Sequence, residues 1–228
     1  GDTVIRYNAS NGYHGGKARV ISEDHLGQIW IGTDGNSVYC FNGDVFHRFD
    51  RQDGIPHFWV TDIIQDINLN MWVATTGGIA KFEPLAPNDF MYNITTYTDQ
   101  LNMGYSPQII DVEEDGLGRI WFGSRTRGIG YILEDKITNF TFKDGVPGAQ
   151  IKSMKVGPKG RLWIGTEGKG VSVASANESL ITFQSMTTEN GLTSDNTYLI
   201  DFDQLAYIWI GSEQGVDKIK LGESLDVI

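Results

Sequence analysis

Two aspartates, Asp62 and Asp111, are the residues of this chain best placed by type and spacing to do chemistry. Each stands four residues before an aspartate that opens a turn, Asp66 or Asp115, so the two occupy equivalent places in successive segments. A pair of carboxylates beside a central channel is what glycoside hydrolysis requires, one as acid and one as base or nucleophile. The alternative, which we favour, is that they line a solvated channel or accept hydrogen bonds from linker amides.

A second group of residues has the chemistry of ligand binding. His57 and Trp59 flank Phe58 in an aromatic cluster, and Arg125 and Arg127 stand where sibling segments carry a glycine-containing turn. Arginine beside exposed aromatic rings suits a sugar face together with a carboxylate or sulfate. The alternative is that the rings pack as linker core while the arginines are solvated. The predicted ligand-binding residues are Arg125, Arg127, His57, Trp59, Tyr105, Glu167 and Lys169.

Signatures of other chemistries are missing from the sequence. The four histidines have no metal-ligand spacing, and no turn has the alternating carboxylates of a calcium loop. A net charge of −11 argues against a nucleic-acid surface, which needs clustered lysine and arginine. Cys40 is the single cysteine, so an intrachain disulfide cannot form. We therefore expect no metal, no cofactor, no catalysis, no nucleic-acid partner and no membrane insertion by this segment.

The elements that must position these residues follow from a five-residue cassette. Its tryptophans recur every 42–49 residues, a period typical of propeller blades. Each cassette is apolar on both faces, as expected of a strand in a sheet that is covered on both sides by neighbouring sheets. The cassettes are IWIGT at 29–33, MWVAT at 71–75, IWFGS at 120–124, LWIGT at 162–166 and IWIGS at 208–212.

Around each cassette the sequence predicts a four-stranded repeat. An alternating strand precedes the cassette, and a glycine-containing turn and two further strands follow it. We expect all five tryptophans to lie in the core between blades. The glycine at the fourth cassette position, alanine in the second repeat, should allow close backbone approach. The turn after the cassette and the linker to the next repeat should open onto one face, the linker rim.

The sequence at the two ends of the chain predicts that the propeller is closed. The fifth repeat stops after its third strand, whereas residues 3–8, TVIRYN, have the pattern of a fourth strand. Pairing between them would close five four-stranded blades and remove exposed sheet edges. Residues 1–228 would then form one β-propeller domain. The alternative is a five-repeat segment of a larger propeller sensor.

The repeat resembles the two-component-regulator propeller repeat. The shared pattern is D-x-x-G-x-[IL]-W-[IF]-G-[TS]-x-x-G, joined by D-G-[IV]-P linkers at residues 53–56 and 144–147. Departures occur at Leu69 and Ala206, which replace the turn glycine, and at Gly157, which replaces the turn aspartate. We expect those turns to differ in shape.

The resemblance implies a function as well as a fold. Members of this family form the extracytoplasmic sensor region of bacterial hybrid sensor kinases, and many respond to oligosaccharides. It therefore implies a non-catalytic, periplasmic or extracytoplasmic binding propeller whose partners are an oligosaccharide or other small ligand and neighbouring domains of the same sensor. The open alternatives are a carbohydrate-active hydrolase or lyase that uses Asp62 and Asp111, and a protein-interaction platform.

Overall fold

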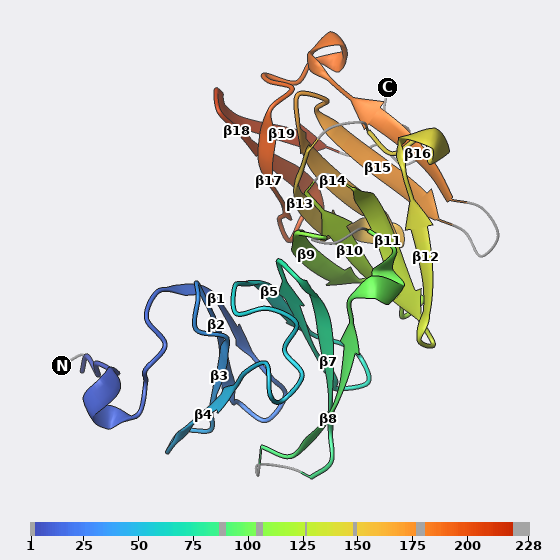
Figure 1. Cartoon of the computed structure of the whole chain (residues 1–228). Helices are drawn as coiled ribbons and strands as arrows, with labels where there is room; N and C mark the ends of the chain where they lie inside the picture. Colours follow the sequence, from blue (N-terminus) through green and yellow to red (C-terminus); the bar gives the residue numbers. More distant parts are fainter. Residues whose placement is uncertain are drawn as a thin grey trace. The chain divides into compact units, whose positions relative to one another are not determined.

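A computed structural model shows an all-β chain of antiparallel sheets, in agreement with the sequence (Figure 1). It describes residues 3–86, 90–103, 107–125, 127–147, 150–176 and 181–220. In these residues there are four four-stranded sheets and one three-stranded sheet, each formed by strands consecutive in the chain. Among the described residues, five short 3-10 helices lie in linkers and turns: η1 (Ala9–Asn11), η2 (Asp99–Leu101), η3 (Phe142–Asp144), η4 (Pro158–Gly160) and η5 (Thr188–Asn190).

The chain divides into two compact units, and each is described by itself. Unit 1 is Gly1–Thr98 and contains the first two sheets. The strands of the first sheet are β1 (Ala18–Glu23), β2 (Ile29–Thr33), β3 (Val38–Phe41) and β4 (Phe46–Phe49). Those of the second are β5 (Val60–Gln65), β6 (Met71–Thr75), β7 (Gly78–Pro84) and β8 (Tyr92–Tyr97).

Unit 2 is Asp99–Ile228 and contains the other three sheets. The third sheet is β9 (Ile109–Glu114), β10 (Ile120–Ser124), β11 (Gly128–Leu133) and β12 (Lys136–Phe140). The fourth is β13 (Gln150–Val156), β14 (Leu162–Glu167), β15 (Val171–Ala176) and β16 (Ile181–Met186). The fifth is β17 (Thr197–Phe202), β18 (Tyr207–Ser212) and β19 (Gly215–Lys220). In both units the first strand of a sheet packs against the first strand of the next, so the arrangement is propeller-like.

A hydrogen bond between a carboxylate and an indole fixes the turn between the first and second strands of the repeat. In the third sheet, one oxygen of Asp115 accepts hydrogen bonds from the backbone amides of Leu117 and Arg119. The other accepts the indole Nε1–H of Trp121 at 2.7 Å and the side chain of Arg119 at 2.6 Å. One side chain therefore shapes the turn and satisfies the donor of a buried ring. The same aspartate-to-indole bond recurs in the pairs Asp24–Trp30, Asp66–Trp72 and Asp203–Trp209.

The fourth sheet lacks this bond because Gly157 occupies the aspartate position. Trp163 is buried, and its indole nitrogen has no hydrogen-bond partner among the described residues. A Cβ at Gly157 would lie 2.3 Å from the ring of Phe202, which comes from the fifth sheet. That ring packs edge-on against Trp163, with centroids 5.9 Å apart. The ring of Phe202 thus lies where the other repeats have the side chain of the turn aspartate.

The other two departures leave the turn unchanged, which corrects our expectation. Leu69 and Ala206 adopt φ of 70° and 60°, close to the 77° and 74° of Gly27 and Gly118 in the equivalent turns. The aspartate of each turn still accepts its backbone amides, which accounts for the retained shape. A left-handed conformation costs a non-glycine residue about 1–2 kcal/mol.

The cassette glycine permits close approach, as predicted. A Cβ on Gly32 would lie 2.4 Å from Val60, on the first strand of the next sheet. At Gly123 the nearest atom is the sulfur of Met154, also on the first strand of the next sheet, at 2.9 Å. Side chains of the following sheet therefore occupy the space that a side chain at this position would fill.

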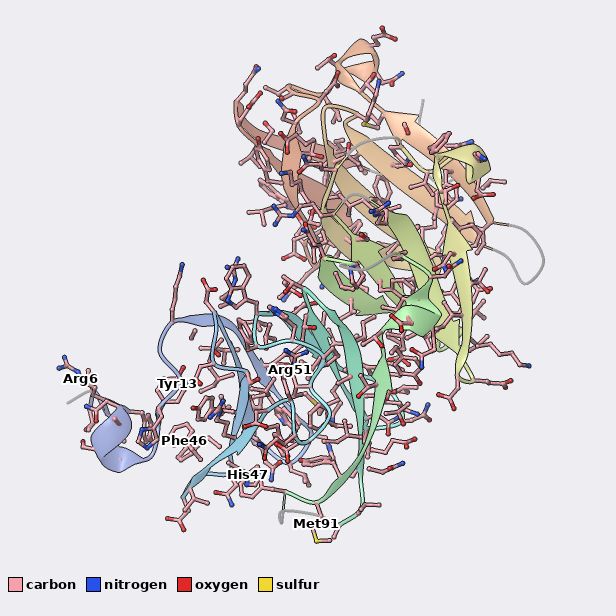
Figure 2. The ribbon with its side chains drawn as sticks, in the orientation of Figure 1. Arg6, Tyr13, Phe46, His47, Arg51 and Met91 are labelled. Atoms are coloured by element: carbon pink, nitrogen blue, oxygen red, sulfur yellow. The ribbon has the colours of Figure 1, made fainter. Side chains whose placement is uncertain are left out.

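Two predictions about the ends of the chain differ from the structure. Residues 3–8 form no strand, and the fifth sheet has three described strands, so closure is not shown. The N-terminal segment instead lies on the first sheet, where Tyr7 packs on Phe41 with ring centroids 5.0 Å apart, and Tyr13 packs on Phe46 at 5.4 Å (Figure 2). Trp209 is 39% exposed, whereas the other cassette tryptophans are at most 3% exposed, because no described sheet follows the fifth.

We expect Asp115→Ala to lower the free energy of unfolding by about 3–5 kcal/mol, since it leaves a buried guanidinium and a buried indole without their acceptor. Asp203→Ala is the matched control. It removes the same type of bond from a partly exposed tryptophan, where water can replace the lost acceptor, and should cost clearly less. Urea unfolding measures both, and equal losses would contradict the role of the buried carboxylate.

Candidate functional site

The linker rim has the predicted geometry in each unit. In unit 1, Asp34 after the first cassette forms a β-bridge with Trp59 in the linker to the second sheet, and the backbone amide of Gly35 donates to the carbonyl of Phe58 at 3.2 Å. In unit 2, Glu167 forms the equivalent bridge with Asn196. The turn that follows a cassette and the next linker therefore open onto the same face within each unit.

The aromatic cluster of unit 1 lies at the surface of this rim. Trp59 is 48% exposed and Phe58 39% exposed, so the alternative of a buried linker core does not describe them. The ring of His57 stacks on Phe58 with centroids 4.2 Å apart and meets Trp59 edge-on at 6.0 Å. The indole of Trp59 passes over Gly35, where an added Cβ would lie 3.4 Å from Nε1. The cluster offers a partly open indole beside a stacked pair of rings.

His57 is held in one orientation by its neighbours. The backbone amide of Trp59 donates to Nδ1 at 3.2 Å, and the hydroxyl of Thr76 lies 2.8 Å from the same atom. Since Nδ1 accepts, the neutral ring carries its proton on Nε2. Burial lowers the pKa of His57, and the positive charge of Arg51 lowers it further. His57 is thus a neutral N–H donor over most of the physiological pH range.

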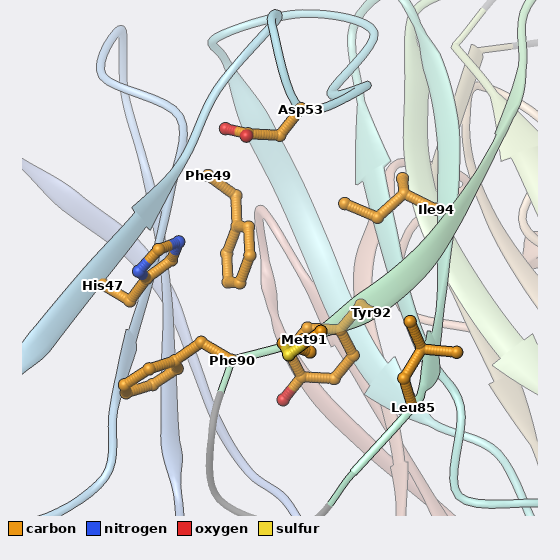
Figure 3. Close-up of a pocket in the computed structure, with 8 residues that line it drawn as sticks. All are labelled: His47, Phe49, Asp53, Leu85, Phe90, Met91, Tyr92 and Ile94. Atoms are coloured by element: carbon orange, nitrogen blue, oxygen red, sulfur yellow. The ribbon is translucent and has the colours of Figure 1, made fainter.

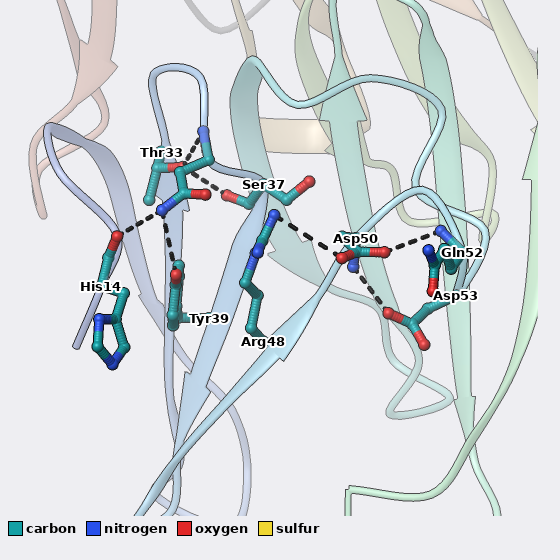
Figure 4. A network of polar contacts seen from close by, with 9 residues as sticks. His14, Thr33, Ser37, Tyr39, Arg48, Asp50, Gln52 and Asp53 are labelled. Carbon is teal, nitrogen blue, oxygen red and sulfur yellow. Dashed lines mark hydrogen bonds and ion pairs between the residues drawn. The ribbon is translucent and has the colours of Figure 1, made fainter. Parts of the chain in front are cut away.

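Polar groups surround the rings of unit 1. The carboxylate of Asp34 lies 3.3 Å from the guanidinium of Arg19 and 3.7 Å from the ammonium of Lys17. The amide of Asn36 donates to the carbonyl of His14 and, at 3.2 Å, to the hydroxyl of Tyr39 (Figure 4). This part of the rim therefore presents positively and negatively charged groups, together with hydrogen-bond donors and acceptors, beside the exposed indole of Trp59.

The predicted arginines lie in unit 2. Arg125 holds the rim through its backbone, which donates to the carbonyl of Gln108 at 3.0 Å and accepts from the amide of Ile151 at 3.2 Å. The backbone amide of Arg127 donates to the hydroxyl of Ser124 at 3.2 Å. Both side chains are exposed. Their placement beside His57 and Trp59 stays a prediction, because the two pairs belong to different units.

Glu167 and Lys169 stand on the rim of the fourth sheet, and both are exposed. The carboxylate of Glu167 forms an ion pair with Lys152 on β13. The same ammonium lies 5.8 Å from the ring centre of Tyr198 on β17. Lys169 lies between two glycines of positive φ whose amides donate to the carbonyl of Asp195. Tyr105 falls outside the described residues.

The alternative catalytic pair occupies the predicted column of the repeat. Asp62 lies opposite Ala74, and Asp111 opposite Gly123, at the same cassette position. The carboxylate of Asp111 accepts the backbone amide of Met154 in the next sheet at 2.6 Å, and that of Asp62 accepts the amide of Ile63 at 2.9 Å. Both therefore bond to backbone amides. They belong to different units, so their side-by-side placement stays a prediction.

A cation lies among the first strands of unit 2. The ammonium of Lys155 on β13 is 2.7 Å from Glu113 on β9. Burial alone would lower the pKa of Lys155, but the hydrogen bond and charge of Glu113, with smaller effects of Asp201 and Asp111, raise it. Lys155 therefore stays charged, and its bond to Glu113 joins the third and fourth sheets.

Sequence reasoning missed Arg51 and Lys152 as members of the rim. Arg51 stands two residues before the DG linker, where the third repeat has Phe142, so comparison of the linkers could have found it. Lys152 lies on β13, outside the linkers, so the same comparison could not have identified it. Among the described residues, no group of three or more histidine, cysteine or carboxylate side chains is arranged to hold a metal, and no helix is long and apolar enough to cross a membrane.

Known structures share this fold over nearly the whole chain. The extracellular domain of the protein described as hybrid two component system BT3049 of B. thetaiotaomicron aligns with a TM-score of 0.73 and 17% identity, covering 95% of this chain and 30% of that one. PorZ, a surface component of the type-IX secretion system of Porphyromonas gingivalis, aligns with a TM-score of 0.73 and 18% identity, covering 96% and 34%. Virginiamycin B lyase of Staphylococcus aureus aligns with a TM-score of 0.64 and 18% identity, covering 94% and 71%.

The chain thus spans about a third of the length of the first two structures. No curated protein matches its sequence. Residues 145–168 match the family described as two component regulator propeller. They contain the last three residues of the second DG linker, the strand β13 and the fourth cassette. The chain carries a two-component-regulator propeller repeat on a propeller-like fold.

Proposed function

We propose that this chain is a non-catalytic, ligand-sensing part of an extracytoplasmic propeller in a bacterial two-component signalling protein. The match at residues 145–168 and the likeness to the extracellular domain of BT3049 support this proposal. Its partners would be a glycan fragment on the linker rim and neighbouring domains of the same protein. Binding would be transmitted by altered contacts with those domains.

The observation that carries the proposal is the exposure of Trp59. The cassette tryptophans of the same unit, Trp30 and Trp72, are 0% and 3% exposed, whereas Trp59 is 48% exposed. A flat indole beside polar groups suits the apolar face of a sugar, whose hydroxyls need donors and acceptors at its edge. The Nε2–H of His57 would donate to such a hydroxyl, and Asp34 would accept from another.

The rim of unit 2 would recognise the charged groups of a ligand. Arg125 and Arg127 provide planar donors that fit a carboxylate or sulfate, and Lys169 adds a third cation. Glu167 would accept from a hydroxyl, and Tyr105 would add a ring. The ligand class that matches these groups of unit 2 is an acidic oligosaccharide.

Trp59→Ala should abolish stacking and weaken binding by about 2 kcal/mol, the scale of an aromatic hot spot. The probe is a glycan array of neutral and acidic oligosaccharides, followed by calorimetry on the strongest hit. The control is Leu205→Ala, since Leu205 is 78% exposed in a turn at the opposite end of its sheet. Equal affinities of the two variants would contradict a site at Trp59.

Arg127→Ala should weaken binding of an acidic hit by about 1.5–3 kcal/mol, the range of a charge-assisted hydrogen bond. Lys159→Ala removes a positive charge from the turn before β14, at the opposite end of that sheet, and should leave the affinity unchanged. Calorimetry on both variants decides between a specific contact and general electrostatics. If the two losses are alike, the site does not include the rim of unit 2.

A hydrolase or lyase is the second candidate, because a lyase shares the fold and Asp62 and Asp111 occupy one column of the repeat. We expect no turnover, since each carboxylate is engaged by a backbone amide. The measurement is product release from polysaccharides and chromogenic glycosides by the unmodified chain. Turnover that disappears in both Asp62→Asn and Asp111→Asn would contradict the sensor proposal and show that the chain is an enzyme.

A further inference from the structure

Unit 1 contains a pocket between the fourth strands of its two sheets, which Asp53 of the DG linker also lines. Its volume is about 320 Å³, at the lower end of the range for small-molecule sites. Phe49, Tyr92 and Ile94 form apolar walls, and His47 and Asp53 contribute polar atoms (Figure 3). All of these residues lie within one unit, so the pocket does not depend on how the units are placed.

A departure from the internal repeat forms one wall of this pocket. The third and fourth strands of the third sheet are joined by Glu134 and Asp135 alone, whereas those of the second sheet are joined by residues 85–91. Phe90 from this longer connection stacks on His47 of the first sheet, with centroids 5.1 Å apart and ring planes 15° apart. Phe90 has a φ of 57°, a conformation that costs a non-glycine residue energy. The connection thus places a ring across the pocket.

The rings around the pocket form a fixed apolar and aromatic surface. Phe49 stacks on the buried Trp30 at 5.7 Å with planes 7° apart, and Tyr92 meets Phe49 edge-on at 5.6 Å. The ring of His47 lies 4.5 Å from that of Phe49. These contacts hold the walls in place before any ligand enters, which lowers the entropic cost of binding. Leu85 and Met91, 63% and 55% exposed, stand at the mouth.

The charge of the pocket is negative. Asp53 is the only carboxylate among the described residues that line it, and none of them is lysine or arginine. One carboxylate oxygen of Asp53 accepts the backbone amide of Asp50 at 2.8 Å, so the side chain is held in place (Figure 4). Aromatic faces attract cations, and a carboxylate beside them adds a direct partner. The matching ligand has a planar apolar body and a positive end.

We propose that this pocket binds a small aromatic amine, with its ring between Phe49, Tyr92 and Phe90 and its ammonium at Asp53. The site is separate from the saccharide site of the proposed function and does not rest on it. A neutral or anionic molecule of the same shape fits the apolar walls equally well but lacks the attraction of the carboxylate. The charge of the ligand therefore distinguishes this assignment from simple filling of an apolar cavity.

The first test uses three probes of matched shape: phenethylamine, 2-phenylethanol and phenylacetate. Binding to the complete chain is followed by backbone amide shifts in NMR titrations. The amine should saturate at millimolar concentration with shifts centred on Phe49, Phe90 and Tyr92, and the alcohol should bind about tenfold more weakly or worse. Phenylacetate should not bind. Equal binding of all three probes, or no binding of the amine at tens of millimolar, would overturn the proposal.

The second test removes the charge and keeps the turn. In the equivalent turn of the fourth repeat, the side-chain oxygen of Asn190 accepts the backbone amide of Thr187 at 3.0 Å, so Asp53→Asn should keep the fold. It should weaken phenethylamine about tenfold or more and leave 2-phenylethanol unchanged. Asp144→Asn is the matched control, because Asp144 accepts the amide of Thr141 at 2.8 Å in the same turn of unit 2. An equal loss in both variants, or none in Asp53→Asn, would refute the role of Asp53.

The third test removes the wall supplied by the long connection. Phe90→Ala should weaken the amine and the alcohol by a similar factor of about ten, since both lose the same ring contact. Unchanged amide shifts in the rest of unit 1 confirm that the variant is folded. If Phe90→Ala leaves both affinities unchanged, the ligand does not occupy this pocket.

Discussion

The structure depends on the bond between the turn aspartate and the tryptophan six residues later. An indole is large enough to fill the space between two sheets, but it brings an N–H group that must be satisfied once it is buried. The turn before the strand provides an acceptor at the right place because its aspartate already faces the backbone amides of that turn. One carboxylate thus links the turn, the second strand and the packing between sheets. Asp115 shows this most completely, since it accepts four hydrogen bonds.

Most of the fold could be predicted because this unit is repeated and local. The cassettes, the glycine that admits the next sheet, and the four strands per repeat all depend on residues close together in sequence. Exceptions arose where distant residues decide the outcome. Phe202 explains how the fourth sheet manages without a turn aspartate, and no local pattern identifies it. The sequence pattern of the N-terminal segment predicts a strand, but the rings of Phe41 and Phe46 hold this segment on the first sheet instead.

The candidate site divides in the same way. The rim that Trp59 occupies could be predicted, because the linkers differ where the repeat is otherwise regular. The sequence left open whether the indole of Trp59 is exposed or packs as linker core. The tautomer of His57 depends on Thr76, which is nineteen residues away, and its lowered pKa depends on burial and on Arg51. The pocket of unit 1 depends on contacts between Phe90 and His47 across two sheets. The regular repeats thus position the two candidate sites, and residues that depart from the repeat provide their functional groups.

Hydrogen exchange of the tryptophan indoles, read from their separate NMR signals, tests the central bond most directly. The account predicts slow exchange for Trp30, Trp72 and Trp121, which are buried and bonded to a carboxylate, and fast exchange for Trp59, which is open at the rim. Addition of a saccharide that binds should slow Trp59 alone. Exchange of Trp121 as fast as that of Trp59 would contradict the claim that the carboxylate holds the buried indole in place.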